Sequence, residues 1–253
     1  MTDLMWDMTW VEFQQRARGG AVAILPWGAT EQHGPHLPLS TDTVQVAEIA
    51  RMVAARTNAV VAPAVPYGYT SQPSSGGGPF FAGTLNLGAD AMIAVARDLL
   101  SELVRHGIRR IVVLSGHGEN MPFLIEGAEQ AVRAAGGDAR VVVVGWWQVI
   151  REETLRALFP GGFPGWDREH AAFVETSMMW ALSPAHVRRD ALRPPEPVET
   201  PAYTVMPPRP DSVPRSGALA DPGRASPEAG QRLVDEVVEG LLHVIEREFP
   251  PGR

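Results

Sequence analysis

Residues 21–34 read AVAILPWGATEQHG, an apolar run that ends in Pro-Trp-Gly and is followed closely by Glu31 and His33. A short apolar run bounded by turn residues is typical of a strand that is buried on both faces of a parallel sheet. Residues 110–120, RIVVLSGHGEN, repeat the arrangement with β-branched residues and His117. Ligands of open α/β sheets lie outside the carboxyl ends of the strands, so these polar residues predict a functional site at that edge.

Segments with helical periodicity alternate with strands along the rest of the chain. Helices are expected at residues 43–56, 89–107, 123–135, 168–182 and 226–249, and further strands at residues 59–68 and 139–147. This alternation predicts an α/β fold, a three-layer α/β/α sandwich whose central sheet is mostly parallel. Residues 194–227 are rich in proline, and we expect them to form a surface arm or an oligomer contact.

The composition limits the possible functions. The chain has 253 residues and shows neither an internal repeat nor a second unit, so residues 1–253 are expected to form a single domain. A net charge of −7 argues against nucleic acid or an anionic membrane as a partner. The absence of cysteine excludes disulfides, thiolate zinc sites and a thiol nucleophile. With no secretory signal and no apolar run long enough to span a bilayer, we expect a cytoplasmic protein.

Three clusters of acidic residues and histidine lie far apart in the sequence. Their members are Glu31, His33 and Asp42, then His117 and Glu119, and last His170 and Glu175. Neutral imidazole and ionised carboxylate are suitable ligands for zinc or manganese, and a bound dication offsets the cost of burying such groups. We therefore expect one binuclear metal site that activates a water for hydrolysis.

Each cluster also has a plainer interpretation. The first can be an ordinary polar loop that ends in a helix N-cap acid at Asp42, and His117 taken alone can be a structural histidine. In the third cluster, His170 can be a residue of the helix surface. Glu119 beside it favours a general base for water. His170 and Glu175 are five residues apart on the expected helix. That spacing separates them by about 140°, so we expect Glu175 to bind metal and His170 to act as a proton donor or oxyanion stabiliser.

Aromatic residues and a glycine-rich segment complete the candidate pocket. Trp147 and Trp166 are expected to stack on a flat substrate ring, with Asp167 as a polar partner, although core packing is the alternative for Trp147. The segment SSGGG at residues 74–78 predicts either a flexible lid or a backbone nest for an anion. It lacks the lysine of a phosphate-binding loop, so nucleotide binding is not expected.

The three clusters together resemble the motifs of the creatininase family. The matching segments are LPWGATEQHGPHLPLSTD, SGHGEN and EHAAFVETS, in this order and at this spacing, and the similarity runs from about residue 10 to residue 249. The segments YGYTSQPSSGGGPFFAGT and FPGGFPGWDREH resemble the creatinine-hydrolysing members rather than only the wider family. The resemblance implies a binuclear amidohydrolase of α/β/α architecture, with two divalent metal ions per chain, zinc or manganese, assembled as a homohexamer.

The resemblance also implies a role for each candidate residue. One metal would be held by Glu31, Asp42 and His117, and the other by His33, Asp42 and Glu175, with Asp42 bridging. The acid–base pair would be Glu119 and His170, and the substrate would be lined by Ser75, Trp147, Trp166 and Asp167.

Gly118 departs from the pattern of the creatinine-hydrolysing members, which carry tyrosine between the histidine and the glutamate of the second motif. The substrate-binding pocket at Gly118 would therefore lose an aromatic wall and a hydroxyl. The expected reaction is metal-dependent hydrolysis of a cyclic amide, creatinine to creatine. The alternative is another small-molecule amide, either a formamide or a short peptide, and a catalytically silent metal-binding protein ranks last because no ligand is missing.

Overall fold

A parallel sheet forms the centre of the computed structural model, which describes residues 2–199, 201 and 203–250. Its strands run in the order β2-β1-β5-β6 and all pair in parallel. They are β1 (Val22–Trp27), β2 (Ala59–Val61), β5 (Arg110–Ser115) and β6 (Arg140–Gly145). A separate pair of two-residue strands, β3 (Gly68–Tyr69) and β4 (Asn86–Leu87), lies in the chain between β2 and β5.

Side chains of the central strands alternate between two apolar cores, one on each face of the sheet. On β1, Val22 and Ile24 belong to one core, while Ala23 and Leu25 belong to the other. Successive side chains of a strand point to opposite faces, so a strand buried on both faces must be apolar throughout. This explains the continuous apolar run at residues 21–28 and confirms the predicted three-layer α/β/α architecture.

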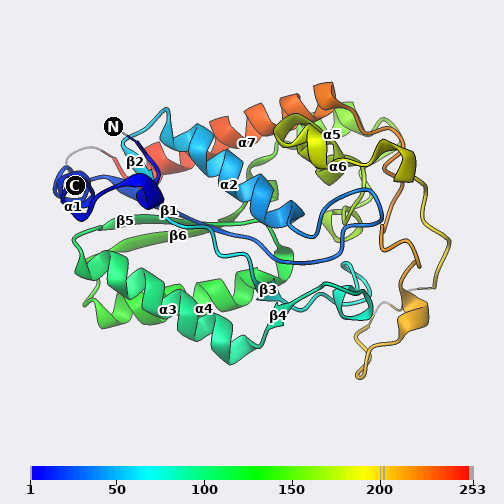
Figure 1. Ribbon diagram of the computed structural model, residues 1–253, viewed down its shortest axis with the longest axis horizontal. Helices are drawn as coiled ribbons and strands as arrows, with labels where there is room; N and C mark the ends of the chain where they lie inside the picture. Colours follow the sequence, from blue (N-terminus) through cyan, green and yellow to red (C-terminus); the bar gives the residue numbers. More distant parts are fainter. Residues whose placement is uncertain (1, 200, 202, 251–253) are drawn as a thin grey trace.

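Helices cover both faces of the sheet (Figure 1). One layer contains α2 (Thr41–Ala54), α6 (Phe173–Leu182) and α7 (Pro227–Glu248), and the other contains α3 (Ala89–Arg105) and α4 (Met121–Ala134). The shorter α1 (Trp10–Arg18) and α5 (Glu152–Leu158) complete the α-helices of the described residues. None of the helices in the part of the chain that is described combines the length and the apolar composition that a membrane crossing requires.

The last helix begins with two residues that favour a helix start. Ser226 accepts a hydrogen bond at Oγ from the backbone N–H of Ala229, at 3.1 Å, and Pro227 occupies the first helical position. A serine cap and a proline at this position are preferred at the start of a helix. The serine oxygen accepts a hydrogen bond from a backbone N–H that has no partner within the helix, and proline has no N–H to satisfy.

The helix expected at residues 168–182 begins later, at Phe173. Ala171 has a left-handed backbone, with φ of 52°, and Ala172 is extended, so neither can continue a helix toward the N-terminus. The backbone N–H groups of Ala171 and Val174 donate instead to the carboxylates of Glu175 and Glu169, at 2.6 and 2.8 Å. His170 therefore lies in the loop before the helix.

The Pro-rich arm (residues 194–227) is not wholly a surface segment. Val213, Ala218 and Leu219 are buried, and the N–H of Leu219 donates to the backbone oxygen of His170 over 3.0 Å. Proline prevents regular structure here but does not prevent apolar side chains from packing. Residues 200 and 202 of the arm lie outside the described residues. The Pro-rich arm therefore combines buried residues such as Val213 and Leu219 with exposed ones such as Arg215.

Candidate metal centre

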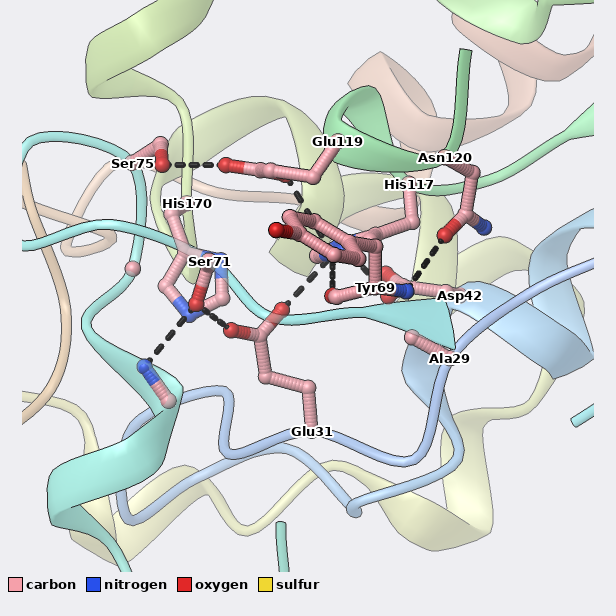
Figure 2. Close-up of polar contacts among 12 residues, drawn as sticks. Ala29, Glu31, Asp42, Tyr69, Ser71, Ser75, His117, Glu119, Asn120 and His170 are labelled. Carbon is pink, nitrogen blue, oxygen red and sulfur yellow. Dashed lines mark hydrogen bonds and ion pairs between the residues drawn. The ribbon is translucent and has the colours of Figure 1, made fainter. Parts of the chain in front are cut away.

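Carboxylates and imidazoles from four elements meet beyond the carboxyl ends of β1 and β5 (Figure 2). Glu31 and His33 follow β1, Asp42 lies in the first turn of α2, His117 follows β5, and Glu175 lies in the first turn of α6. All of them are buried, with between 1 and 8 % of their surface exposed. The structure thus brings together every residue that the sequence proposed as a metal ligand.

His117 presents one ring nitrogen to the carboxylates. Its Nδ1 lies 3.2 Å from Oε2 of Glu31 and 3.4 Å from Oδ2 of Asp42. Its Nε2 lies 2.9 Å from the backbone oxygen of Tyr69 and donates a hydrogen bond to it when it carries the hydrogen. That bond leaves the lone pair of Nδ1 directed at the two carboxylates, which is the arrangement that metal-ligating histidines use.

His33 has the same arrangement with the nitrogens exchanged. Its Nε2 lies 2.9 Å from Oδ1 of Asp42 and 3.6 Å from Oε2 of Glu175. Its Nδ1 lies 3.1 Å from the backbone oxygen of Glu31, which can accept a hydrogen bond from it. Both imidazoles are therefore oriented by a backbone carbonyl and face carboxylate oxygens with the other nitrogen.

The donor atoms fit divalent metal ions. Three sets of three side chains have ligand atoms within 4.8 Å of one another, namely Glu31, Asp42 and His117, then His33, Asp42 and Glu175, and also Glu31, His33 and His170. Oε2 of Glu31, Oδ2 of Asp42 and Nε2 of His33 are buried without a hydrogen-bond partner. Leaving buried polar atoms unpaired is costly, and a cation bound among them removes that cost. Mixed nitrogen and oxygen donors suit zinc or manganese.

The pKa values of the cluster show how strongly its charges interact. Burial raises the pKa of Glu31 to about 7 and that of Glu175 to about 8. Burial opposes the charged form of His33, but Asp42 and Glu175 raise its pKa to about 10. Burial also opposes ionisation of Asp42, yet His33 and His117 hold its pKa well below its ordinary value. Without a cation the cluster thus retains protons at neutral pH, and metal binding would release them.

Glu119 lies at the edge of this cluster, in the turn between β5 and α4. Its side chain is 18 % exposed, and its Oε2 lies 3.2 Å from Nε2 of His117. Ser75 donates a hydrogen bond from Oγ to Oε1 of Glu119 (Figure 2). The Glu119 carboxylate therefore contacts the ligand cluster and is also partly accessible to solvent.

A cavity of about 350 Å³ opens above the cluster. The substrate-lining residues expected from the sequence all border it, namely Ser75, Gly118, Trp147, Trp166 and Asp167. Trp146 is buried and meets Trp147 and Trp166 edge-on, with ring centroids 5.8 and 5.7 Å apart and interplanar angles of 88° and 89°. Trp146 is thus a core residue that also borders the cavity, and it packs against Trp147 and Trp166.

His170 lies inside the cluster rather than on a helix. Its ring centroid is 4.3 Å from that of His33, and its Nε2 is 2.8 Å from the backbone oxygen of Gln32. The sequence argument that separated His170 from Glu175 by helical geometry is therefore wrong, because only Glu175 belongs to α6. Burial, together with the charge of His33, keeps the pKa of His170 well below its ordinary value. A neutral imidazole at the cavity can accept or return a proton.

The sequence did not single out several residues that shape the site. Ser71 donates from Oγ to Oε1 of Glu31 (Figure 2), and no motif marked it in advance. Asn120 precedes α4 but its side chain makes no capping hydrogen bond. It donates from Nδ2 to the backbone oxygen of Gly28 and accepts at Oδ1 from the N–H of Tyr69, at 3.0 and 2.9 Å, so it connects the loop after β1 to β3.

The glycine loop (residues 74–78) serves close packing around the site. A side-chain carbon on Gly76 would lie 3.0 Å from the ring of His170, and one on Gly78 would lie 2.6 Å from Oε1 of Glu31. One on Gly77 would overlap Val213 of the Pro-rich arm. The glycines therefore let the backbone approach His170, Glu31 and the arm.

Comparison with known proteins agrees with this site. The Creatininase family, described as creatinine amidohydrolase, matches residues 6–245. The creatinine amidohydrolase of Pseudomonas putida is 39% identical over 251 residues, which cover 97% of this chain and 96% of that protein. A mycofactocin precursor peptide peptidase of Mycobacterium tuberculosis is 35% identical, over 90% of this chain and 85% of that protein.

Solved structures agree as well. A mutant creatininase of Zn-Zn type superposes with a TM-score of 0.95 at 38% identity, covering 99% of this chain and all of that one, and a creatininase described as the Mn form gives the same values. The similarity extends over almost the whole chain and agrees with the buried cluster of carboxylates and imidazoles, so it identifies the family. The chain belongs to the creatininase (creatinine amidohydrolase) family.

Proposed function

We propose that this protein hydrolyses creatinine to creatine with two divalent metal ions per chain. The observation that carries the proposal is the buried cluster at the floor of a cavity whose lining includes three tryptophans. Family membership supports the reaction, since the Pseudomonas putida relative is a creatinine amidohydrolase. The hydrolysis breaks the ring amide C–N bond, with the water oxygen going to the carbonyl carbon and a proton to the departing nitrogen.

The metal ions, zinc or manganese, would be held by the residues that the cluster provides. Glu31, Asp42 and His117 would bind one ion and His33, Asp42 and Glu175 the other, with Asp42 shared. Bound divalent metals lower the pKa of water and polarise a carbonyl oxygen.

Proton transfer is assigned to Glu119 and His170. Glu119 borders the cavity and is held by the hydroxyl of Ser75, so its free oxygen can accept the proton of the attacking water. His170 also borders the cavity. Once its free ring nitrogen has accepted a proton, the imidazolium can stabilise the reacting oxygen or pass that proton to the leaving nitrogen, and the low pKa of His170 favours its release.

Substrate orientation is assigned to the cavity wall. Trp147 and Trp166 present aromatic surface to a flat, guanidinium-like ring, which stacking and cation–π attraction would hold. The carboxylate of Asp167 can accept hydrogen bonds from N–H groups of such a ring. Ser75, which we expected to contact substrate, is bonded to Glu119 and can also orient this base.

The test is conversion of creatinine to creatine by protein reloaded with zinc or manganese, beside a chelator-treated control, with metal content measured in each sample. Turnover that requires metal supports the proposal. Absence of turnover in protein that holds two metals per chain would refute creatinine as the substrate while leaving the hydrolytic machinery in place.

A second candidate is the same centre acting on another amide, either a short peptide or a formamide. Gly118 favours it, because this residue is exposed at the cavity and a side chain there would meet no atom within 4 Å. The identity of 35% to a mycofactocin precursor peptide peptidase also supports it. Incubating metal-loaded protein with peptide and formamide panels, followed by mass spectrometry, separates the two candidates.

We also propose that residues 1–253 form one domain that assembles as a homohexamer in the cytoplasm, on the basis of the family resemblance. The exposed tryptophans Trp6 and Trp10, with 74 and 75 % of their surface accessible, support association with other copies because large apolar side chains are usually covered. Analytical ultracentrifugation of the metal-loaded protein tests the oligomer size.

A further inference from the structure

Gln32 lies between the metal ligands Glu31 and His33, yet its own side chain points to other partners. It is 5 % exposed, and its amide nitrogen donates to the backbone oxygens of Gly76 and Gly217, at 2.8 and 2.9 Å. Its amide oxygen accepts from the N–H of Gly34 at 2.9 Å. One side chain thus joins the glycine loop, the Pro-rich arm and the first metal motif.

The neighbours of this amide fix its orientation. A flipped amide would place its oxygen against two carbonyl oxygens and its NH₂ group against the N–H of Gly34, which are all repulsive contacts. Both hydrogens of the amide nitrogen are therefore used by Gly76 and Gly217. No hydrogen remains for the third atom in reach, Nε2 of His170, which lies 2.8 Å away.

Because the Gln32 amide has no hydrogen left to donate, its backbone oxygen determines which nitrogen of the His170 ring carries the hydrogen. Nε2 of His170 also lies 2.8 Å from the backbone oxygen of Gln32, which can only accept. If Nε2 lacked a hydrogen, two lone pairs would face each other at that distance with no donor to separate them. Nε2 must therefore carry the hydrogen and donate to Gln32, which leaves Nδ1 as the nitrogen with the free lone pair.

From these contacts we infer that Gln32 is a positioning residue, whose amide ties the glycine loop and the Pro-rich arm around His170 and so holds Nε2 of that imidazole, which carries the hydrogen, against the backbone oxygen of Gln32. The inference rests on the proposed function of His170 in proton transfer. It also assigns a role to the Pro-rich arm, because the Gln32 amide that lies against His170 donates a hydrogen bond to the backbone oxygen of Gly217. Gly217 has φ of 80°, and a side-chain carbon there would overlap the amide of Gln32.

Two substitutions disturb this arrangement from opposite sides. Gln32→Met keeps the length of the side chain and removes its amide, and Gly217→Ala pushes against the same amide without changing Gln32. The matched control is Gly137→Ala, because Gly137 has a similar φ of 85° but open space where the new carbon would be. Thr154→Val, which removes a partly buried hydrogen bond to Glu236 outside the site, controls for a general loss of stability.

We expect both test variants to lower kcat for creatinine about 10- to 100-fold, since small displacements of a catalytic group have effects of this size. KM and metal content should stay within about twofold of wild type, and both controls should keep wild-type kcat. In a His170→Ala background, Gln32→Met should cause no further loss, because its effect passes through that ring. Unchanged kcat in either test variant, additive losses in the His170→Ala background, or a loss that follows metal content would each overturn the inference.

A measurement without substrate tests the same inference separately. Nitrogen-15 NMR of the zinc-loaded protein with labelled histidine reports which ring nitrogen carries hydrogen, and the His170 signals are those lost in His170→Ala. We expect hydrogen on Nε2 in wild type and a mixture of both forms in Gln32→Met. Hydrogen on Nδ1 in wild type overturns the inference. If wild type does not hydrolyse creatinine, the proposed substrate fails and the NMR result alone decides the role of Gln32.

Discussion

Replacing Glu169 by glutamine should stabilise this protein at neutral and alkaline pH. Glu169 is 4 % exposed, and its only hydrogen bond among the described residues is the one that Oε2 accepts from the N–H of Val174, at 2.8 Å. Burial raises the pKa of Glu169 from the ordinary 4.5 to about 7, against the effect of that bond. At 1.36 kcal/mol per pKa unit, the ionised side chain costs the folded state about 3 kcal/mol. Glutamine keeps an acceptor oxygen for Val174 and does not ionise.

The pH dependence has a definite sign. Well below pH 4.5 Glu169 is protonated in the folded and the unfolded chain, so its burial changes nothing with pH. Between pH 4.5 and about 7 only the unfolded chain loses the proton, so wild-type stability falls as the pH rises, and above about 7 the penalty is constant. The advantage of Glu169→Gln over wild type should therefore grow by about 2 to 3 kcal/mol between pH 5 and pH 8.

Urea unfolding of both proteins at the two pH values, in the presence of chelator so that metal binding adds no pH dependence, measures this difference. Glu236→Gln is the control of opposite sign. Burial disfavours the ionised Glu236, but hydrogen bonds from Thr154 and Arg151 hold its pKa below the ordinary value. That variant should lose stability at neutral pH, and the loss should shrink as the pH falls. An advantage of Glu169→Gln that is equal at pH 5 and pH 8 would refute the burial argument.

Three further predictions concern catalysis. Glu119→Gln should lower kcat by about 10²- to 10⁴-fold, the usual contribution of a general base, with metal content unchanged; metal analysis that finds fewer ions would instead make Glu119 a ligand. Ser75→Ala removes a hydrogen bond to a charged group, worth about 1.5–3 kcal/mol, so kcat should fall about 10- to 150-fold, whereas an effect confined to KM would mean that Ser75 contacts only substrate. Gly118→Tyr fills open space at the cavity, so it should reduce turnover of amides larger than creatinine by at least about tenfold relative to creatinine, in competition assays with paired substrates. Equal effects on both substrates would contradict the role of Gly118 in admitting larger amides.

The elements that leave a local sequence pattern were predictable, and the helix start that depends on glutamate side chains bonded to the backbone was not. The strand at β1 and the helix at α7 were evident, because burial on both faces and a Ser-Pro start leave local patterns. The late start of α6 was not, because it depends on carboxylates of Glu169 and Glu175 that bind backbone N–H groups. The sequence pattern predicts one helical segment over residues 168–182, and it does not indicate the left-handed backbone conformation of Ala171.

The site shows the same division at the level of single residues. Each proposed ligand lay in a motif, so the sequence could identify Glu31, Asp42 and His117 without knowing their distances. Ser71 and Gln32 are different, since a serine or glutamine becomes significant only through the atoms it faces in the folded chain. The same holds for Val213, Ala218 and Leu219, whose burial has no signal in a proline-rich composition.

The sequence by itself determined the layered α/β architecture, the chemical type of the centre and the family, because each depends on residue type and local spacing. Only the tertiary structure decided which ring nitrogen of each histidine faces the carboxylates, that His170 stands in the cluster rather than on a helix, and that the Pro-rich arm reaches it through Gln32. The physical reason is that hydrogen bonds and ligand geometry act over about 3 Å between residues that are far apart in the chain. A pattern of residue types along the chain does not specify such distances.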